Sequence, residues 1–274
     1  MSNCQHLHIP GMYLDDATTG AMDQWFGLRQ GAILSAVMGP AGHLFYRASE
    51  LVAMHTYFSN PLQLGVAATA IRIYFACYGA AGSPGLPDPS LAGRFTLIFA
   101  PATLVPPVHI SLLLNQARDV GYYYNIPPGG AFNSVTSKIS TDLFTAWTNN
   151  WKTQLDKLPA DPVDDNNGSA QDTPAIYTET KCVFYIMKAF TELISEIQCQ
   201  GADGVRISLT SHLDFGKFSK RLTTQFKLTD ANDNPIYIDL TGRPPASDKE
   251  FASFDTGVPC PPYTGCPIQG PPNP

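Results

Sequence analysis

Residues 71–78 of this chain read Ile-Arg-Ile-Tyr-Phe-Ala-Cys-Tyr and are the strongest indication of its fold. The stretch is short, β-branched and aromatic, which predicts a β-strand with Arg72 on one of its faces. A Gly- and Pro-rich loop over residues 79–89 leads to Arg-Phe-Thr-Leu-Ile-Phe-Ala-Pro at residues 94–101, a second strand that ends at a proline. The two strands together predict a hairpin with a long loop.

A second hairpin of the same kind lies later in the chain. Arg206 stands between Val and Ile, as Arg72 stands between two Ile residues, and it follows Arg72 by 134 positions. Residues 221–226 match residues 94–99 at a distance of 127 positions, with a shorter loop between the second pair of strands. The two matches occur in the same order, which indicates an internal duplication.

Helical sequence precedes each hairpin. Residues 49–58 are predicted to form a helix, and residues 178–200 have the clearest helical spacing in the chain, with Gly201 placed to end that helix in a left-handed conformation. Tyr177 follows Tyr46 by 131 positions, which gives a third match just upstream of the two helices.

A further amphipathic helix with tryptophan is expected upstream in each half. These helices cover residues 15–34, with Trp25, and residues 140–158, with Trp147 and Trp151. The expected fold class is therefore α+β, with two tandem helix-helix-strand-strand repeats around antiparallel sheet and an extended Pro-rich C-terminal tail.

The expected boundaries follow from this repeat. The first αββ repeat, with an N-terminal segment, covers residues 1–135, the second covers residues 136–257, and the Pro/Gly-rich tail covers residues 258–274. A turn at residues 230–234 is expected to lead into a short strand at residues 235–239. One αββ repeat alone would leave a sheet edge and a sheet face open, so we expect the halves to pack as one body.

The strand motifs resemble a group of small proteins that are common in Bacteroidota. Residues 72–78, residues 97–101 and the Cys-Pro-Pro segment within residues 254–262 are similar to that group's Arg-Ile-Tyr-Phe, Leu-x-Phe-x-Pro and Cys-Pro-Pro motifs. The resemblance implies a tandem copy of the group's fold, although Ser208 and Leu209 stand where Tyr-Phe would be expected. The group has no known activity, so the resemblance implies no functional residue.

Composition argues against several functional classes. The net charge is −6, only 15% of residues are charged, and the 17 Lys and Arg residues form no run, so the basic footprint of a nucleic-acid binder is missing. Low charge combined with 11% aromatic residues is typical of chains whose surface is partly covered by protein partners. An Ala- and Gly-rich globular domain without partners is the alternative interpretation.

No targeting or membrane-spanning segment is predicted. Residues 1–8 lack the basic start and apolar stretch of a secretory signal. The most apolar stretch, residues 62–82, is interrupted by Arg72 and has strand character, so no transmembrane helix is expected. The default compartment is the cytoplasm, with export by a non-classical route as the alternative.

The six cysteines divide into two groups. Cys77, Cys182 and Cys199 lie in apolar patterns, which favours free, buried thiols. Cys260 and Cys266 bracket Pro-Pro-Tyr-Thr-Gly, and this spacing would close a small disulfide loop in an oxidising compartment.

The N-terminal Cys4-x-His6-x-His8 is the sharpest local cluster. On an extended strand the three side chains would face the same way, and thiolate with imidazole suits zinc or copper. No fourth ligand is close in sequence, so metal binding through Cys4, His6 and His8 is the third functional hypothesis. No cofactor is predicted.

No catalytic motif is found, and no catalytic residue is assigned. Arg72 and Arg206 occupy matching strand positions, where they would either form paired salt bridges across a pseudo-dyad between the halves or bind an anion there; strand arginines favour the structural role. Asp203, which lies between two small turn residues, would act as a base only in the second functional hypothesis: an enzyme or small-ligand-binding protein with its site between the repeats.

The leading functional hypothesis is a non-enzymatic structural or interaction protein that self-assembles or docks on a protein partner. Strand addition at an open sheet edge is the expected mode of association. Large aromatic residues dominate interface energetics. The expected interaction residues are Trp25, Tyr122, Tyr123, Tyr124, Trp147 and Trp151.

Overall fold

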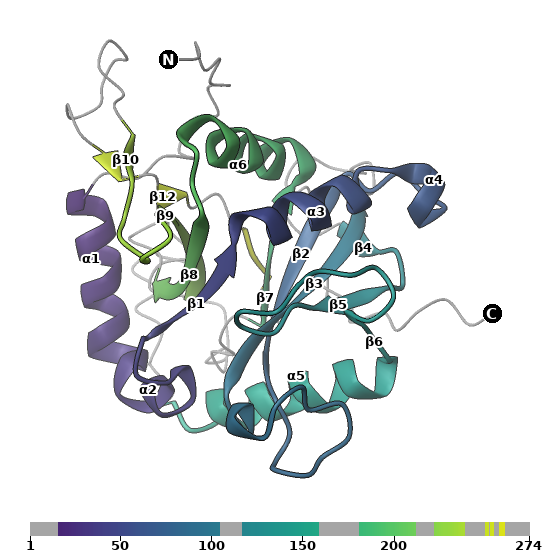
Figure 1. Ribbon diagram of the computed structural model, residues 1–274. Coiled ribbons are helices and arrows are strands. Elements are labelled where there is room, and N and C mark those ends of the chain that lie inside the picture. The colour runs from purple at the N-terminus through teal and green to yellow at the C-terminus, as the bar shows by residue number, and fades with distance from the viewer. Residues whose placement is uncertain are drawn as a thin grey trace, which may run out of the picture.

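The chain forms an α+β fold with antiparallel sheets (Figure 1). The computed structural model describes residues 16–104, 117–158, 181–211, 222–238, 250–251, 253–254 and 258–260. Two antiparallel sheets contain most of the strands, and helices cover their outer faces and one end of the pair.

The first half of the chain contains helices α1 to α4 and strands β1 to β6. Their bounds are α1 Asp16–Phe26, α2 Ala32–Met38, β1 His43–Arg47, α3 Ala48–Phe58, α4 Pro61–Leu64, β2 Ala70–Cys77, β3 Phe95–Leu104, β4 Ala117–Asp119, β5 Tyr123–Asn125 and β6 Lys138–Ile139. A π-helical turn, Gly27–Gly31, joins α1 to α2, and a 3-10 turn, Pro89–Leu91, lies in the loop before β3.

The second half contains helices α5 and α6 and the remaining strands. Their bounds are α5 Thr141–Leu155, β7 Cys182–Ile186, α6 Met187–Gln200, β8 Gly204–Ser211, β9 Leu222–Thr229, β10 Tyr237–Ile238, β11 Glu250–Phe251, β12 Ser253–Phe254 and β13 Val258–Cys260.

The two principal sheets exchange their first strands. The smaller sheet has the order β1-β8-β9-β12, and the larger sheet has the order β13-β7-β2-β3-β5-β6, with β4 also on β3. Strand β1 therefore pairs with the hairpin of the second half, whereas β7 pairs with the hairpin of the first half. All of these pairs are antiparallel, and a separate two-stranded sheet joins β10 to β11.

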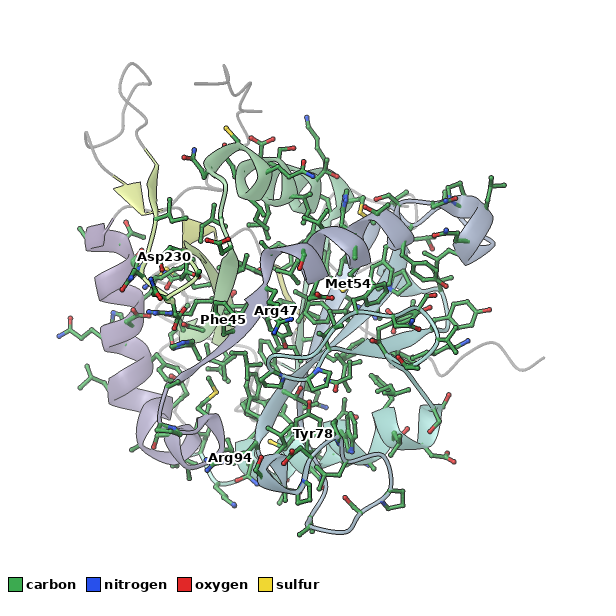
Figure 2. All side chains as sticks on the ribbon, in the orientation of Figure 1. Phe45, Arg47, Met54, Tyr78, Arg94 and Asp230 are labelled. Atoms are coloured by element: carbon green, nitrogen blue, oxygen red, sulfur yellow. The ribbon has the colours of Figure 1, made fainter. Side chains whose placement is uncertain are left out.

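Both exchanged strands run directly into a helix; Figure 2 labels Phe45 and Arg47 on β1 and Met54 on the helix that follows it. The residue at each junction, Arg47 or Ile186, has an extended backbone, with φ −63° and ψ 139° for the first and φ −60° and ψ 143° for the second. Helix α3 follows β1, helix α6 follows β7, and the two helices contact each other over the same end of the sheets.

A continuous hydrophobic core lies between the inner faces of the two sheets. One cluster of buried residues includes members of β1, β2, β3, β7, β8 and β9 together with α2, α3 and α6. Tyr46 packs edge-on against Phe99 with ring centroids 5.8 Å apart, and Tyr185 packs edge-on against Phe226 at 5.3 Å. Because each pair joins one sheet to the other, the halves share their core.

Helices also cover the outer faces. Helix α5 packs on β2, and helix α1 packs on β8. Trp147, Phe144 and Tyr78 belong to a second buried cluster between α5 and the larger sheet. Gly204 lies under the Phe45 ring, and a Cβ at that position would come within 2.2 Å of the ring.

The structure confirms the α+β class, the two hairpins and the helix over residues 49–58, but it corrects the longest helix. Residues 182–186, which were expected to be helical, form β7, and α6 begins at Met187. This part of the expected helix is a short continuous apolar run, and such a run does not distinguish a buried strand from a helix. Strand β1 was missed, and the helix expected over residues 15–34 is interrupted at Gly27–Gly31.

The matched tyrosines Tyr46 and Tyr185 give a test of the shared core. The Tyr185 hydroxyl lies 2.7 Å from Thr224 Oγ1, whereas the buried Tyr46 hydroxyl has no hydrogen-bond partner among the described residues. We expect Tyr185→Phe to lower the free energy of unfolding by about 1 kcal/mol, and Tyr46→Phe to leave it unchanged or raise it. Urea denaturation of both variants measures the difference; equal losses would contradict the assigned hydrogen bonding.

Candidate functional site

Arg72 forms a buried ion pair on the outer face of β2. Its Nη1 lies 3.0 Å from Asp119 Oδ1, and the two side chains are 2% and 4% exposed. The same Nη1 donates to the Tyr74 hydroxyl at 2.9 Å, and that hydroxyl donates to Asp119 Oδ2. The Tyr123 hydroxyl lies 3.5 Å from Asp119 Oδ2. The four side chains form one polar cluster in a mostly aromatic layer.

Burial dominates the electrostatics of this cluster. Loss of solvent raises the pKa of the Asp119 carboxyl, although Arg72 and the neighbouring hydroxyls act in the opposite direction. Burial also raises the pKa of the Tyr74 hydroxyl well above its ordinary value, and it raises the pKa of the nearby Cys182 thiol to about 12. The Tyr74 hydroxyl and the Cys182 thiol therefore keep their protons near neutral pH.

A second set of hydrogen-bonded side chains lies in the same aromatic layer between the larger sheet and α5. The Tyr78 hydroxyl donates to Asn125 Oδ1 at 3.0 Å, and Asn125 Nδ2 donates to Thr96 Oγ1 at 2.8 Å. Trp147 packs edge-on against Tyr78, and Phe144 stacks on Tyr123. Phe144 of α5 covers Tyr74 and Tyr123, and the Arg72 and Asp119 side chains are themselves buried, so the ion pair has little access to a ligand in solution.

Arg206 forms a more exposed cluster on the outer face of β8. Its Nη2 lies 3.0 Å from Asp233 Oδ2 and donates to the Asp233 backbone oxygen at 2.6 Å. His43 Nε2 lies 3.0 Å from the same Oδ2. The side chains of His43, Arg206 and Asp233 are 14%, 24% and 34% exposed, so solvent reaches this cluster.

The turn that carries Asp233 is tightly organised. Asp233 has φ 62°, and among the described residues it is the one non-glycine residue with a positive φ. The Asp230 carboxylate accepts hydrogen bonds from the backbone N–H groups of Asn232 and Asn234. The sequence indicated a turn here but gave no sign that Asp233 would pair with Arg206.

The expected structural role of both arginines is therefore observed. Each arginine pairs with an aspartate from a segment that follows its own hairpin, rather than with a group across an axis between the halves. Asp203 is exposed, and its backbone oxygen accepts from the Ala48 N–H at 2.9 Å. Asp203 thus closes the turn before β8.

The expected interaction residues are mostly inside the fold. Trp147 and Trp151 are 2% and 1% exposed, and Tyr123 and Tyr124 are also buried. These four residues pack within the chain, so their burial needs no partner; amphipathic spacing alone did not separate core aromatics from surface ones. Tyr122 is half-buried, with Lys138 Nζ 3.8 Å from its ring centroid. Trp25 remains exposed, at 38%.

The cysteines show one departure from expectation. Cys77 and Cys182 are free and buried, as expected, whereas Cys199 is disulfide-bonded. Cys4, His6, His8 and Cys266 lie outside the described residues, as does the side chain of Cys260. Within the described ranges no group of three or more potential metal-ligating side chains is found.

The outer edge of β1 is a structural feature that the sequence did not reveal. The Ala48 N–H donates to Asp203 beside β8, which fixes the alternation: residues 44 and 46 direct their backbone groups toward β8, and His43, Phe45 and Arg47 direct theirs outward. No backbone hydrogen bond joins these outward groups to another part of the described chain. The edge thus presents a row of donors and acceptors.

Comparison of the chain with protein-family models, with curated proteins and with solved structures finds no match. Within the described residues no helix is long and apolar enough to cross a membrane.

The two arginine clusters should differ in their contribution to stability. Arg72→Met leaves the buried Asp119 without its counter-ion and should cost about 3–5 kcal/mol. Arg206→Met, at a partly exposed pair, should cost about 1 kcal/mol or less. Chemical denaturation measures both. The double variant Arg72→Met/Asp119→Leu should recover part of the loss; similar costs at the two sites would contradict this assignment.

The free thiols should be inert in the folded protein. Burial raises the pKa of Cys77 and of Cys182 to about 12, so at pH 8 only about one thiol in ten thousand is ionised. We expect no alkylation of either residue by iodoacetamide until the chain unfolds, as followed by mass spectrometry of the peptides. Rapid labelling at pH 8 without unfolding would show that the thiols are accessible.

Proposed function

We propose that this protein is a non-enzymatic structural or interaction protein that self-assembles or docks on a protein partner. The observation that carries the proposal is the contrast between a shielded interior and an open periphery. The strongest polar cluster, around Arg72, is buried, whereas the outer edge of β1 pairs with no described strand and an apolar surface near the end of α1 is exposed.

The apolar surface supports self-assembly. Trp25, near the end of α1, and Leu28, in the π-helical turn, are three residues apart and are 38% and 72% exposed. Large exposed apolar side chains that lie together are characteristic of association surfaces. Aromatic residues such as Trp25 contribute most to the free energy of such contacts.

An internal duplication is part of the same proposal. Strand β7 follows β1 by 139 positions, β8 follows β2 by 134, and β9 follows β3 by 127. Applied to the inter-sheet contact Tyr46–Phe99, these distances give Tyr185–Phe226, which is the other inter-sheet contact. The pairing registers also correspond: Arg206 is opposite Phe45, and Arg72 is opposite Phe184.

The proposed duplication modifies the repeat expected from sequence. Each repeat becomes helix-strand-helix-strand-strand: α1, β1, α3, β2 and β3 in the first, and α5, β7, α6, β8 and β9 in the second. The expected distances of 134 and 127 agree with these elements. The match between Tyr46 and Tyr177 does not, because 139 positions after Tyr46 is Tyr185. We also propose that each of the two repeats corresponds to one copy of the fold of the Bacteroidota group that the strand motifs resemble.

A small-ligand-binding protein is the second candidate. It is supported by the solvent-accessible His43, Arg206 and Asp233 cluster with its positive-φ aspartate, because such backbone conformations are concentrated at functional sites. Arg206 is already neutralised by Asp233, so interaction at the periphery remains the leading proposal.

Light scattering of the purified chain tests self-assembly. We expect a mass that exceeds the 29.7 kDa of one chain and rises with concentration. Leu28→Lys should return the mass toward that of one chain, because it places a charge in the apolar surface. Leu62→Lys is the matched control, since Leu62 is 94% exposed on the distant α4 and its replacement should change nothing. A constant monomer mass at all concentrations would reject self-assembly.

A further inference from the structure

We infer that the β1 edge is a docking site for an extended segment of another protein, which adds antiparallel to β1 as an extra strand with a Val/Ile-Pro-small core. This inference deepens the proposed interaction function and rests on it. It assigns to His43, Phe45 and Arg47 the role of backbone partners for the incoming strand.

The corresponding edge of the other sheet already holds such a strand. The Met187 N–H donates to the Thr69 oxygen at 2.8 Å, as the Ala48 N–H donates to the Asp203 oxygen at 2.9 Å. The backbone N–H and C=O groups of residues 182, 184 and 186 therefore face away from β2, as those of residues 43, 45 and 47 face away from β8. On β7 this row is occupied by β13, with Val258 opposite Phe184 and Cys260 opposite Cys182.

The side chains around the β7 edge and the β1 edge also occupy corresponding positions. Phe184 packs in a cluster with Ala70 and Ala102. Phe45 lies over Gly204, and the Thr229 hydroxyl is close to the same point. At the proposed distances of 139, 134 and 127 positions, Phe45 corresponds to Phe184, Gly204 to Ala70, and Thr229 to Ala102. The β1 edge is thus built like one that binds a strand, and in the described chain it lacks one.

The register of β13 specifies the chemistry of the occupant. The backbone groups of Val258 and Cys260 face β7. Pro259, opposite Val183, has its backbone nitrogen on the side away from β7, so the pairing loses no hydrogen bond to the proline. A segment with the same x-Pro-x core can therefore pair with β1 without losing a hydrogen bond. On β1 the aliphatic residue would lie opposite Phe45, and the proline opposite Leu44.

Charge adds a further requirement. Arg47 is exposed, and on β7 the corresponding position is Ile186. The residue opposite Arg47 would stand two positions before the aliphatic residue, so an acidic side chain there would form a favourable cross-strand pair. The exposed Arg47 also favours another partner over pairing of two β1 strands, because antiparallel pairing centred on Phe45 would set Arg47 opposite His43, which offers no carboxylate.

The balance of strands argues against the tail of a second copy as the occupant. Each chain supplies one β13 strand and two corresponding edges, on β7 and β1. In the single chain β13 already fills the β7 edge. If copies exchanged their β13 strands, each chain would still have only one of its two edges filled, so the exchange would add no strand pairing. The described strands of this chain therefore leave one of the two edges open, and a strand from another protein would fill it.

The probe is a synthetic peptide of residues 253–262 with Cys260→Ser, added to the full-length chain and followed by fluorescence anisotropy. We expect saturable binding that weakens about tenfold or more when the peptide is N-methylated at the position of Val258, because a donor is lost and the methyl group blocks the ladder. Thr256→Asp in the peptide should tighten binding about two- to fivefold. Arg47→Glu in the protein should remove that gain.

Matched proline variants locate the binding edge. Arg47 has φ −63°, which proline adopts without strain, so Arg47→Pro removes one outward N–H without disturbing the pairing with β8. Relative to Arg47→Ala it should weaken peptide binding about two- to tenfold. Ile186→Pro makes the same change at the β7 edge, where φ is −60°, and should have no effect.

The outcomes separate this inference from the proposed function. Absence of peptide binding, or binding that responds to Ile186→Pro and not to Arg47→Pro, overturns the β1 site. If the chain still self-assembles in light scattering, the interaction function stands without that site. A constant monomer that also fails to bind the peptide rejects both.

Discussion

The antiparallel pairing of β1 with β8, and of β7 with β2, is the constraint on which the rest of the structure depends. Each half places its first strand in the sheet of the other half, so neither hairpin has a complete set of neighbours from its own half. The shared core, the contact between α3 and α6, and the position of α1 and α5 on opposite outer faces all follow from this exchange. The halves cannot separate without exposing two strand edges and the core between them.

The same scaffold surrounds its two central arginines with different environments. Arg72 is buried in an aromatic layer, where removal of either partner of its ion pair with Asp119 would be costly. Arg206 lies on a partly exposed face of the central strand β8, where it pairs with Asp233 of the following turn. A strand position that is equivalent in register can therefore be a core ion pair in one half and a surface contact in the other. The difference comes from what packs on the outer face, and the strand sequence does not specify that.

This limit explains how far the sequence could predict the structure. Local patterns were sufficient for the β2, β3, β8 and β9 strands, because β-branched runs bounded by turn residues have few alternatives. Local patterns failed at β7, because its apolar run continues directly into α6 with no turn residues between them. The partners Asp119 and Asp233 were also out of reach, since they lie 47 and 27 residues from their arginines and nothing local marks them. Aromatic residues on amphipathic helices indicated a buried face, but the burial of Trp147 and Trp151 within the chain is a tertiary property.

The exchange of first strands also imposes an order on biosynthesis. Strand β1 ends at residue 47, and its partner β8 ends at residue 211, so more than half of the chain is synthesised between them. At about 5–20 residues per second, the nascent strand waits roughly 10–30 seconds for its partner. During that interval β1 has both edges open and its apolar side chains uncovered. A ribosome-associated chaperone that covers exposed apolar segments would find β1 uncovered throughout this interval.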